Sequence, residues 1–321
     1  MRKVLFATTA LVALGGVSAA TADISVSAGN EMQYKSWSSS TTTTANNNSV
    51  TNKTSYKISA SAVTDNGLTL SSYTSQDGTT GGSWNDLGFS IAGDFGTLGF
   101  AGSESGDAFA TATDVTPDED MNYTAANITS MGTFKPADEN VAGADVSYLS
   151  PDINGFQFAI GMDQGSASGS SDATIYGVQY SMTSGDASIT VKYAASSGQK
   201  ASAAATDVEA TSLGLVVGYG DLTITLADNT KKKGTTYDYS AQSVGVTYAA
   251  SDVLTLSAYT GSTEDGKDAT HDVSDTGVGL AYTITPGLSL SVTYNDWDIK
   301  DTTTSYNEDG SITTVALDLS F

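Results

Sequence analysis

The chain has 321 residues and carries 36 acidic against 13 basic side chains, which gives a formal net charge of −23 and a sequence without cysteine. This surplus of negative charge repels nucleic acid and argues against phosphate binding; the lack of cysteine excludes disulfides and thiolate metal sites. With 33 glycines, 16 tyrosines and only 4 prolines, the composition favours a large continuous sheet.

The N-terminal residues have the features of an export signal. Met1–Lys3 is a positive region, Val4–Leu14 is an apolar core, and Ala20–Ala22 is a small-residue cleavage site. The apolar core is too short for a stable membrane helix. We therefore expect a signal peptide at residues 1–22 and one domain at 23–321. No later stretch approaches 18 apolar residues, so a membrane-bound mature chain would have to be a barrel.

Along the expected mature domain, apolar and small polar residues alternate in short segments. Side chains alternate across a strand, so each segment predicts a strand with one apolar face. Turn sequences such as Asp65-Asn66-Gly67 separate them, since asparagine and glycine tolerate the positive φ of tight turns. The polar stretch Ser36–Thr54 is expected to be a loop. The predicted strands are Ile24–Tyr34, Tyr56–Val63, Leu68–Tyr73, Leu87–Ala92, Leu98–Ala101, Ala144–Leu149, Phe156–Met162, Thr174–Met182, Ala187–Tyr193, Leu213–Tyr219, Leu222–Leu226, Val244–Tyr248, Val253–Tyr259, Val278–Ile284, Leu288–Tyr294 and Ser311–Phe321.

These sixteen segments are joined alternately by short turns and longer polar connections. Outer-membrane barrels have an even number of strands, short turns on the periplasmic side and longer loops outside. The last segment, Ser311–Phe321, can close the sheet against Ile24–Tyr34 and so remove its edges. The predicted fold is all-β, a sixteen-stranded antiparallel transmembrane β-barrel.

The two faces of the predicted strands support a membrane barrel over a soluble sandwich. In Leu222–Leu226 and Leu288–Tyr294 the residues between the apolar ones are Ser or Thr. A soluble sandwich would carry Lys and Glu on its outer face, whereas small uncharged side chains suit a water-filled lumen. Seven tyrosines near predicted strand ends on the apolar face match an aromatic girdle: Tyr34, Tyr180, Tyr193, Tyr219, Tyr248, Tyr282 and Tyr294.

One stretch, Gly106–Gly143, breaks the alternation and is called the acidic segment below. Its main carboxylates are Asp107, Asp114, Asp118, Glu119 and Asp120. Long irregular segments inside compact folds are usually functional or disordered. These carboxylates therefore either line a pore, where they favour cations, or lie on a solvated external loop. Asp118, Glu119 and Asp120 could also bind Ca²⁺ through oxygen ligands, although the EF-hand pattern is absent; no other cofactor is expected.

The export signal, the sixteen strands, the long acidic third external loop and the terminal Phe321 resemble a Gram-negative general-diffusion porin. The likeness is closest to the short trimeric porins of purple photosynthetic bacteria and their relatives. The resemblance implies a homotrimer of water-filled barrels, with the third loop folded inward as a constriction. It also implies that the barrel-assembly machinery recognises the C-terminal strand through Phe321.

In that family a basic wall on the early strands faces the acidic loop. Lys35 and Lys57 resemble its contributors, because both have polar-face positions on the first two predicted strands; the alternative is that both are rim lysines with long flexible stems. The sequence also departs from the family. The Pro-Glu-Phe-Gly-Gly loop signature of enterobacterial porins is absent, and so is the arginine of their constriction.

Enzyme motifs are missing from the sequence. Its one histidine, His271, has no nucleophile motif near it. We therefore expect a channel in the outer membrane of a Gram-negative bacterium. It would allow passive diffusion of small hydrophilic solutes and ions, with a preference for cations. Its partners would be outer-membrane lipid and lipopolysaccharide. Lys231–Lys233, in a predicted external loop, would either contact the lipopolysaccharide or be solvated. The alternatives are a solute-selective channel with a ladder of aromatics along its lumen, or an exported adhesive or surface-layer β-protein.

Overall fold

The computed structural model describes residues 22–40, 48–78, 86–100, 145–163, 171–200, 208–233, 237–265, 271–301 and 306–321. Within these ranges the regular structure consists of strands and tight turns. A search of the same ranges found no helix with the length and apolar character needed to cross a membrane.

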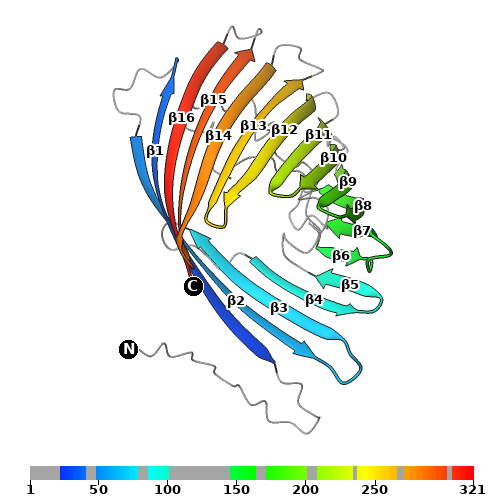
Figure 1. Ribbon diagram of the computed structural model, residues 1–321. Helices are drawn as coiled ribbons and strands as arrows, with labels where there is room; N and C mark the ends of the chain where they lie inside the picture. Colours follow the sequence, from blue (N-terminus) through cyan, green and yellow to red (C-terminus); the bar gives the residue numbers. More distant parts are fainter. Residues whose placement is uncertain are drawn as a thin grey trace, which may run out of the picture.

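The strands form one closed barrel (Figure 1). Each strand pairs antiparallel with its sequence neighbours, and the last pairs with the first, so the described sheet has no free edge. The sixteen predicted strands and their up-and-down order are therefore confirmed. Their bounds are β1 Asp23–Ser39, β2 Asn48–Val63, β3 Thr69–Gly78, β4 Asp86–Gly93, β5 Gly96–Phe100, β6 Val146–Leu149, β7 Phe156–Asp163, β8 Ser171–Ser184, β9 Ala187–Lys200, β10 Val208–Tyr219, β11 Leu222–Lys233, β12 Tyr237–Ser251, β13 Leu254–Asp265, β14 His271–Thr285, β15 Leu288–Asp301 and β16 Tyr306–Ser320.

The barrel closes where the sequence predicts. β16 pairs with β1 from Gly29↔Ser320 to Ser39↔Gly310. Beyond that ladder the backbones of Ala28 and Phe321 exchange two hydrogen bonds, of 3.2 and 2.9 Å. The side chain of Phe321 is 78% exposed. Within the described chain, the last residue thus contributes to closure through its backbone.

Several strands run further towards the long-loop rim than the alternation predicts. The predicted loop Ser36–Thr54 is wrong at both ends, since β1 continues to Ser39 and β2 begins at Asn48. Lys231–Lys233 was also expected in a loop but ends β11, where Lys232 forms a 3.2 Å salt bridge with Asp238 of β12. Apolar alternation stops at the edge of the hydrocarbon, whereas backbone pairing can continue where both faces are polar.

Short turns connect the strands at the opposite rim, as predicted. The turn between β6 and β7 shows the local chemistry: Asn154 and Gly155 have φ values of 56° and 87°, and the Gly155 amide donates to Asp152 Oδ1 over 2.9 Å. A Cβ on Gly155 would collide with the carbonyl oxygen of Ser181. Only glycine fits this position, because both its φ and its closeness to β8 exclude a side chain.

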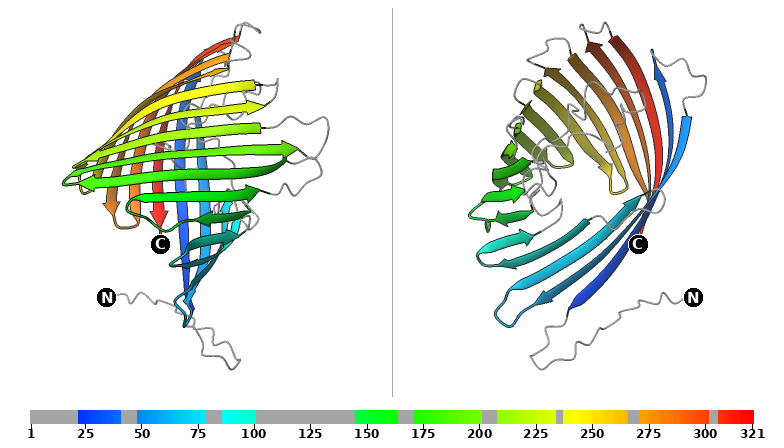
Figure 2. Two further views of the ribbon diagram at one scale, coloured as in Figure 1. Left: turned by 90° about the vertical axis from the view of Figure 1, so that its right-hand side faces the viewer. Right: turned by 180° about the vertical axis from the view of Figure 1, so that it is seen from behind.

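The apolar faces of the strands point out of the barrel. Six of the seven predicted girdle tyrosines are between 43% and 68% exposed: Tyr34, Tyr180, Tyr219, Tyr248, Tyr282 and Tyr294. Tyr294 lies near the middle of β15, and β1 continues for five residues after Tyr34, so neither tyrosine marks the end of its strand. β1 and β15 therefore extend past the apolar band, and Figure 2 shows the long strands β8–β16 beside the shorter strands β4–β7.

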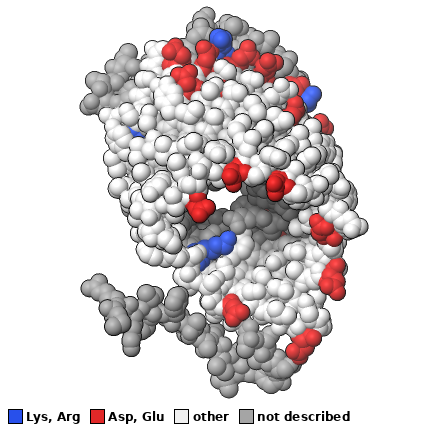
Figure 3. All heavy atoms as spheres, viewed as in Figure 1, with Lys and Arg blue, Asp and Glu red and all other residues white. Residues whose placement is uncertain are grey.

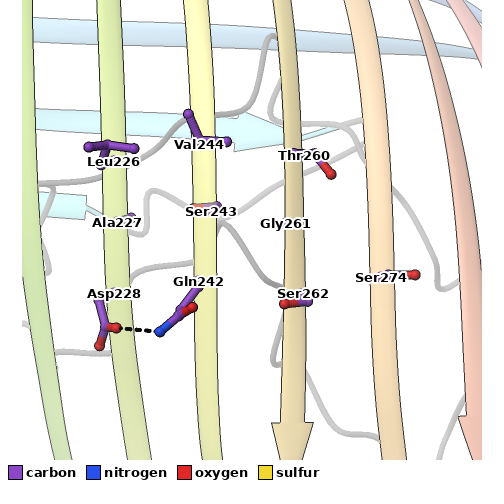
Figure 4. A pocket seen from close by; sticks show the side chains of 10 residues that line it. All are labelled: Leu226, Ala227, Asp228, Gln242, Ser243, Val244, Thr260, Gly261, Ser262 and Ser274. Atoms are coloured by element: carbon purple, nitrogen blue, oxygen red, sulfur yellow. Dashed lines mark hydrogen bonds between the residues drawn. The ribbon is translucent and has the colours of Figure 1, made fainter.

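A shallow groove on the outer wall marks the edge of this apolar band. It has a volume of about 490 Å³ and crosses β11–β14. In Figure 4, Leu226 and Val244 stand at one level, and Asp228, Gln242 and Ser262 stand at the next. Gln242 Nε2 donates to Asp228 Oδ2 over 2.9 Å. A charged residue at this level indicates that the hydrocarbon region ends between the two rows.

Candidate functional site

The inner face of the barrel can be identified from β1. Met32 and Tyr34 are 49% and 45% exposed and belong to the apolar outer face, whereas Gln33 and Lys35, with the opposite parity, are 5% and 9% exposed. Lys35 is opposite Thr314 of β16. Pairing carries this assignment from strand to strand, because directly opposed residues of a sheet lie on the same face.

A recess of about 460 Å³ lies on the inner face of β2–β6 and is called the serine recess below. Among the Ser and Thr residues that border it, six from the five strands β2–β6 have inner-face positions: Ser59, Ser61, Ser71, Ser90, Thr97 and Ser147. Gly88 and Gly99 lie among them. The expectation of small uncharged lumen residues is met here, so water and solutes face neutral donors and acceptors. Figure 3 shows an opening into the molecule with carboxylates at its edge and lysine inside it.

Lys57 and Tyr73 supply the charged and aromatic groups of this recess. Lys57 Nζ lies 4.4 Å from the centroid of the Tyr73 ring, which is a cation–π contact. The ring lies against β4 at Gly88, where an added Cβ would overlap ring atoms. Lys57 therefore lies on the inner face, as its parity predicts, with its ammonium held against a fixed ring.

A second recess, of about 270 Å³, contains charged residues that the sequence did not single out. Glu31, Lys53 and Asp318 line it, and Glu31 is opposite both Lys53 and Asp318 in the sheet. Parity could have identified Glu31 and Asp318, which lie inside predicted strands. Lys53 was missed because it fell in the predicted loop Ser36–Thr54.

The inner face of β13–β16 also carries an apolar part, outside the segments from which its polarity was predicted. Near the long-loop rim, Val273, Trp297, Ile299 and Ile312 form a buried cluster, against which Trp37 packs. Beside this cluster the Tyr259 hydroxyl donates to Asp275 Oδ2 over 2.5 Å. Large side chains thus occupy this part of the wall, beyond the segments such as Leu288–Tyr294 from which small lumen residues were predicted.

The remaining predicted site residues divide into two groups. Lys35 and Lys57 both have inner-face positions, on β1 and β2. The five carboxylates of the acidic segment lie outside the described residues, and so does the inward fold of that segment. The described part of the chain contains no group of three or more His, Cys, Asp or Glu side chains suited to a metal ion. The suggested Ca²⁺ ligands are not among those residues and stay a prediction.

A closed barrel with apolar side chains outside and hydroxyls inside matches known proteins. A family model described as Gram-negative porin matches residues 7–302. A search of curated proteins found no match. Solved structures are similar to this chain over nearly its whole length.

OmpT of Vibrio cholerae, in-vitro folded and in its trimer form, has a TM-score of 0.65 at 13% identity, covering 94% of this chain and 99% of that one. The outer-membrane channel DcaP of Acinetobacter baumannii has a TM-score of 0.66 at 13% identity, covering 94% and 97%. A mutant of Rh. blastica porin has a TM-score of 0.62 at 15% identity, covering 93% and 100%. At these identities the structural likeness shows the fold, and the family match adds the membership. The chain therefore belongs to the Gram-negative porin family and is a multi-pass outer-membrane protein.

Proposed function

We propose that the barrel is a passive diffusion pore for small hydrophilic solutes and ions, rather than an enzyme. The serine recess is the observation that carries this proposal. Its hydroxyls offer neutral hydrogen-bonding groups to any small polar solute, and most of its side chains are short. Such a wall can replace the hydrogen bonds that a solute makes with water without binding that solute tightly. Conduction requires binding weak enough for the solute to leave again.

Solute flux through the purified protein tests this proposal. Reconstituted in a planar bilayer, the protein should give discrete conductance steps in KCl. In liposomes it should admit small sugars at rates that fall steeply with solute size. Conductance steps without any sugar entry would restrict the protein to ions and contradict the general pore.

The same pore should prefer cations. The net charge of −23 and the carboxylates of the acidic segment support this preference, while Lys35 and Lys57 on the inner wall oppose it. Carboxylates near a narrow channel raise the local concentration of cations. A reversal potential measured across a KCl gradient gives the sign of the preference directly. If Ca²⁺ binds the acidic segment, it should reduce that potential.

A homotrimer is the proposed assembly, as in the trimer form of the Vibrio cholerae protein. Supporting this, the outer face of β1 and β2 carries an amide cluster: Asn30 Nδ2 donates to Asn52 Oδ1 over 3.0 Å and to Thr54 Oγ1 over 3.1 Å. Asn30 is opposite Leu319 and Asn52 is opposite Met32, so the cluster has apolar neighbours. Exposing side-chain amides to lipid costs free energy, whereas the same groups can form hydrogen bonds in a contact between subunits.

Disulfide cross-linking tests where the copies meet. The native chain has no cysteine, so a single Asn52→Cys substitution should give cross-linked dimers on oxidation. Leu256→Cys, on the outer face of β13, should give no cross-linked product in the same assay and migrate as the single chain on a denaturing gel. Equal cross-linking of both variants would remove the support for a contact at β1 and β2.

The remaining proposals concern export and the membrane. Residues 1–22 act as the signal peptide, and N-terminal sequencing of the protein from outer membranes should begin at Asp23. In the membrane, lipid surrounds the apolar band, and lipopolysaccharide meets the polar outer rows near the long-loop rim. The barrel-assembly machinery recognises the C-terminal strand.

A further inference from the structure

The seven short turns form one rim of the barrel, called the short-turn rim below, and most of them carry the same charge. Five of these turns contain an aspartate whose side chain is exposed, and this group is called the rim aspartates: Asp94, Asp152, Asp186, Asp221 and Asp252. Asp65, in a sixth turn, interacts with another group of the protein and is not counted among them. The sequence places no lysine or arginine in any of the seven turns. The charged side chains of these turns are therefore all negative.

Turn chemistry alone does not require these carboxylates. Aspartate and asparagine both suit tight turns, because either side chain can accept a hydrogen bond from the backbone. In the β6–β7 turn the Gly155 amide donates to Asp152 Oδ1, and the side-chain oxygen of an asparagine could accept the same bond. Asn154 already lies in that turn. Neutral side chains of the same shape would thus serve the backbone, and the charge of the rim aspartates is available for another role.

The closed barrel sets the distances between these charges. Sixteen strands about 4.8 Å apart, tilted by about 40°, enclose a barrel with a radius of about 16 Å. Neighbouring short turns are two strands apart, which is about 12 Å along the rim. This spacing is too wide for a common metal ion, whose oxygen ligands lie within about 2.6 Å. Figure 3 shows acidic side chains around the opening into the barrel, so their combined field acts on the mouth of the pore.

Salt concentration decides how strongly this field acts. Five unit charges about 16 Å from the barrel axis, treated with Coulomb's law in water, raise the local concentration of a monovalent cation on the axis about 3.5-fold at about 0.01 M salt. At about 0.1 M salt the same charges raise it only about 1.5-fold, because the Debye length falls from about 30 Å to about 10 Å. Anions are depleted by the same factors. The rim aspartates therefore act strongly only when the solution on their own side is dilute.

We propose that the rim aspartates are a determinant of ion selectivity that makes the cation preference depend on the direction of the salt gradient. This inference rests on the proposed pore function, because the ions pass between the short-turn mouth and the lumen. A charge in the middle of the lumen meets both solutions, whereas a charge at one mouth is screened by the solution on that side. The cations concerned are monovalent ions in transit, and none of them is held at a fixed place.

Reversal potentials in two gradient directions test this proposal. The full-length protein, in a planar bilayer, separates KCl at about 0.01 M from KCl at about 0.1 M, first with the dilute solution at the short-turn rim and then with the solutions exchanged. The ratio of K⁺ to Cl⁻ permeability should be at least about twofold higher in the first direction, since the two local concentration factors differ by that much. Asparagine at all five rim positions should make the ratio equal in both directions. The heat-dependent gel shift shows that this variant is folded.

A matched control removes the same number of carboxylates from another part of the molecule. Five acidic residues have outer-face positions on β10–β15, towards the long-loop rim: Glu209, Asp228, Glu264, Asp272 and Asp296. Replacing them by the corresponding amides changes the net charge equally. The difference between the two gradient directions should persist in this control.

A single cysteine provides a second measurement that avoids the multiple variant. The native chain has no cysteine, so Asp186→Cys can be labelled after folding with methanethiosulfonate reagents of either charge. The compartment from which the reagent reacts also shows which solution the short-turn rim faces. With dilute salt at that rim, an anionic label should raise the permeability ratio and a cationic label should lower it.

Three results would overturn the role of the rim aspartates while leaving the pore function intact. The first is a wild-type permeability ratio that is equal in both gradient directions. The second is a difference between directions that survives in the variant with five asparagines. The third is loss of that difference in the control variant, which would assign it to the net charge of the molecule. Absence of conductance in the wild-type protein would instead refute the proposed pore function.

Discussion

Placing one arginine on either face of β13 should have opposite consequences. Leu256 is 42% exposed on the outer face, and its direct neighbours in the sheet are Tyr248 and Leu280. Ser257 is next in sequence and lies on the inner face, opposite Thr247 and Gly279. Leu256→Arg exposes a guanidinium to lipid, whereas Ser257→Arg places it among small groups in the lumen.

The cost of the outer substitution depends on how deep Leu256 lies in the apolar band, where its direct neighbours are a girdle tyrosine, Tyr248, and Leu280. Arginine on the lipid face costs about 2–4 kcal/mol near the bilayer midplane and less near the interfaces. A cost of 2–4 kcal/mol lowers the folded-to-unfolded ratio roughly 30- to 900-fold, since about 1.4 kcal/mol is tenfold. Ser257→Arg should cost under about 1 kcal/mol, because the group remains hydrated.

Urea-dependent folding into lipid vesicles measures both variants, with the folded fraction read from the heat-dependent shift on gels. Leu256→Lys should behave like Leu256→Arg, and Leu256→Val should be close to wild type. Ser257→Arg should fold normally and change single-channel conductance. If Ser257→Arg destabilises the barrel more than Leu256→Arg does, the assignment of faces is wrong.

Three further predictions concern closure, a turn and selectivity. Deleting Phe321 removes its two backbone hydrogen bonds to Ala28 and should leave protease-sensitive protein in the periplasm; normal levels of folded barrel would contradict this. Gly155→Ala should destabilise by more than about 1 kcal/mol in urea titrations, and by more than Gly185→Ala, whose Cβ would meet no atom within 4 Å. Replacing the carboxylates of the acidic segment by amides should reduce the reversal potential most in dilute salt, where the Debye length reaches about 30 Å at 0.01 M; an unchanged potential would place the segment outside the pore.

The closed barrel could be predicted because two simple rules apply over most of its length. One face of each strand meets hydrocarbon, so its residues alternate, and each short turn needs residues that accept its backbone angles. Glycines in these turns, such as Gly67 and Gly287, have positive φ values of 81°. The pairing of β16 with β1 followed from the same alternation, because both strands needed a partner.

The ends of the strands could not be predicted in this way. Beyond the apolar band both faces of a strand contact water, so polar residues such as those of 36–39 and 48–54 no longer show a period of two. Sequence alternation therefore measures the thickness of the hydrocarbon rather than the length of the strand. Lys53 was assigned to a loop for this reason, and the second recess was missed with it.

Residues of the inner wall were harder to predict than those of the outer wall, because one part of the inner face contacts water and another part is buried against protein. At the serine recess the strand face meets water, and small hydroxyls occupy it. Near Trp297 and Ile299 the same face is buried and carries large apolar groups. Parity identifies both regions as inner face but cannot separate them, since the difference depends on neighbours across several strands.

Gly88 and Gly310 show how such neighbours act: each leaves room for a ring from the adjacent strand, Tyr73 in one case and Trp297 in the other. A glycine opposite an aromatic residue on the inner face is thus the sequence feature that would have indicated where the wall holds a fixed ring, and at Tyr73 that ring holds Lys57.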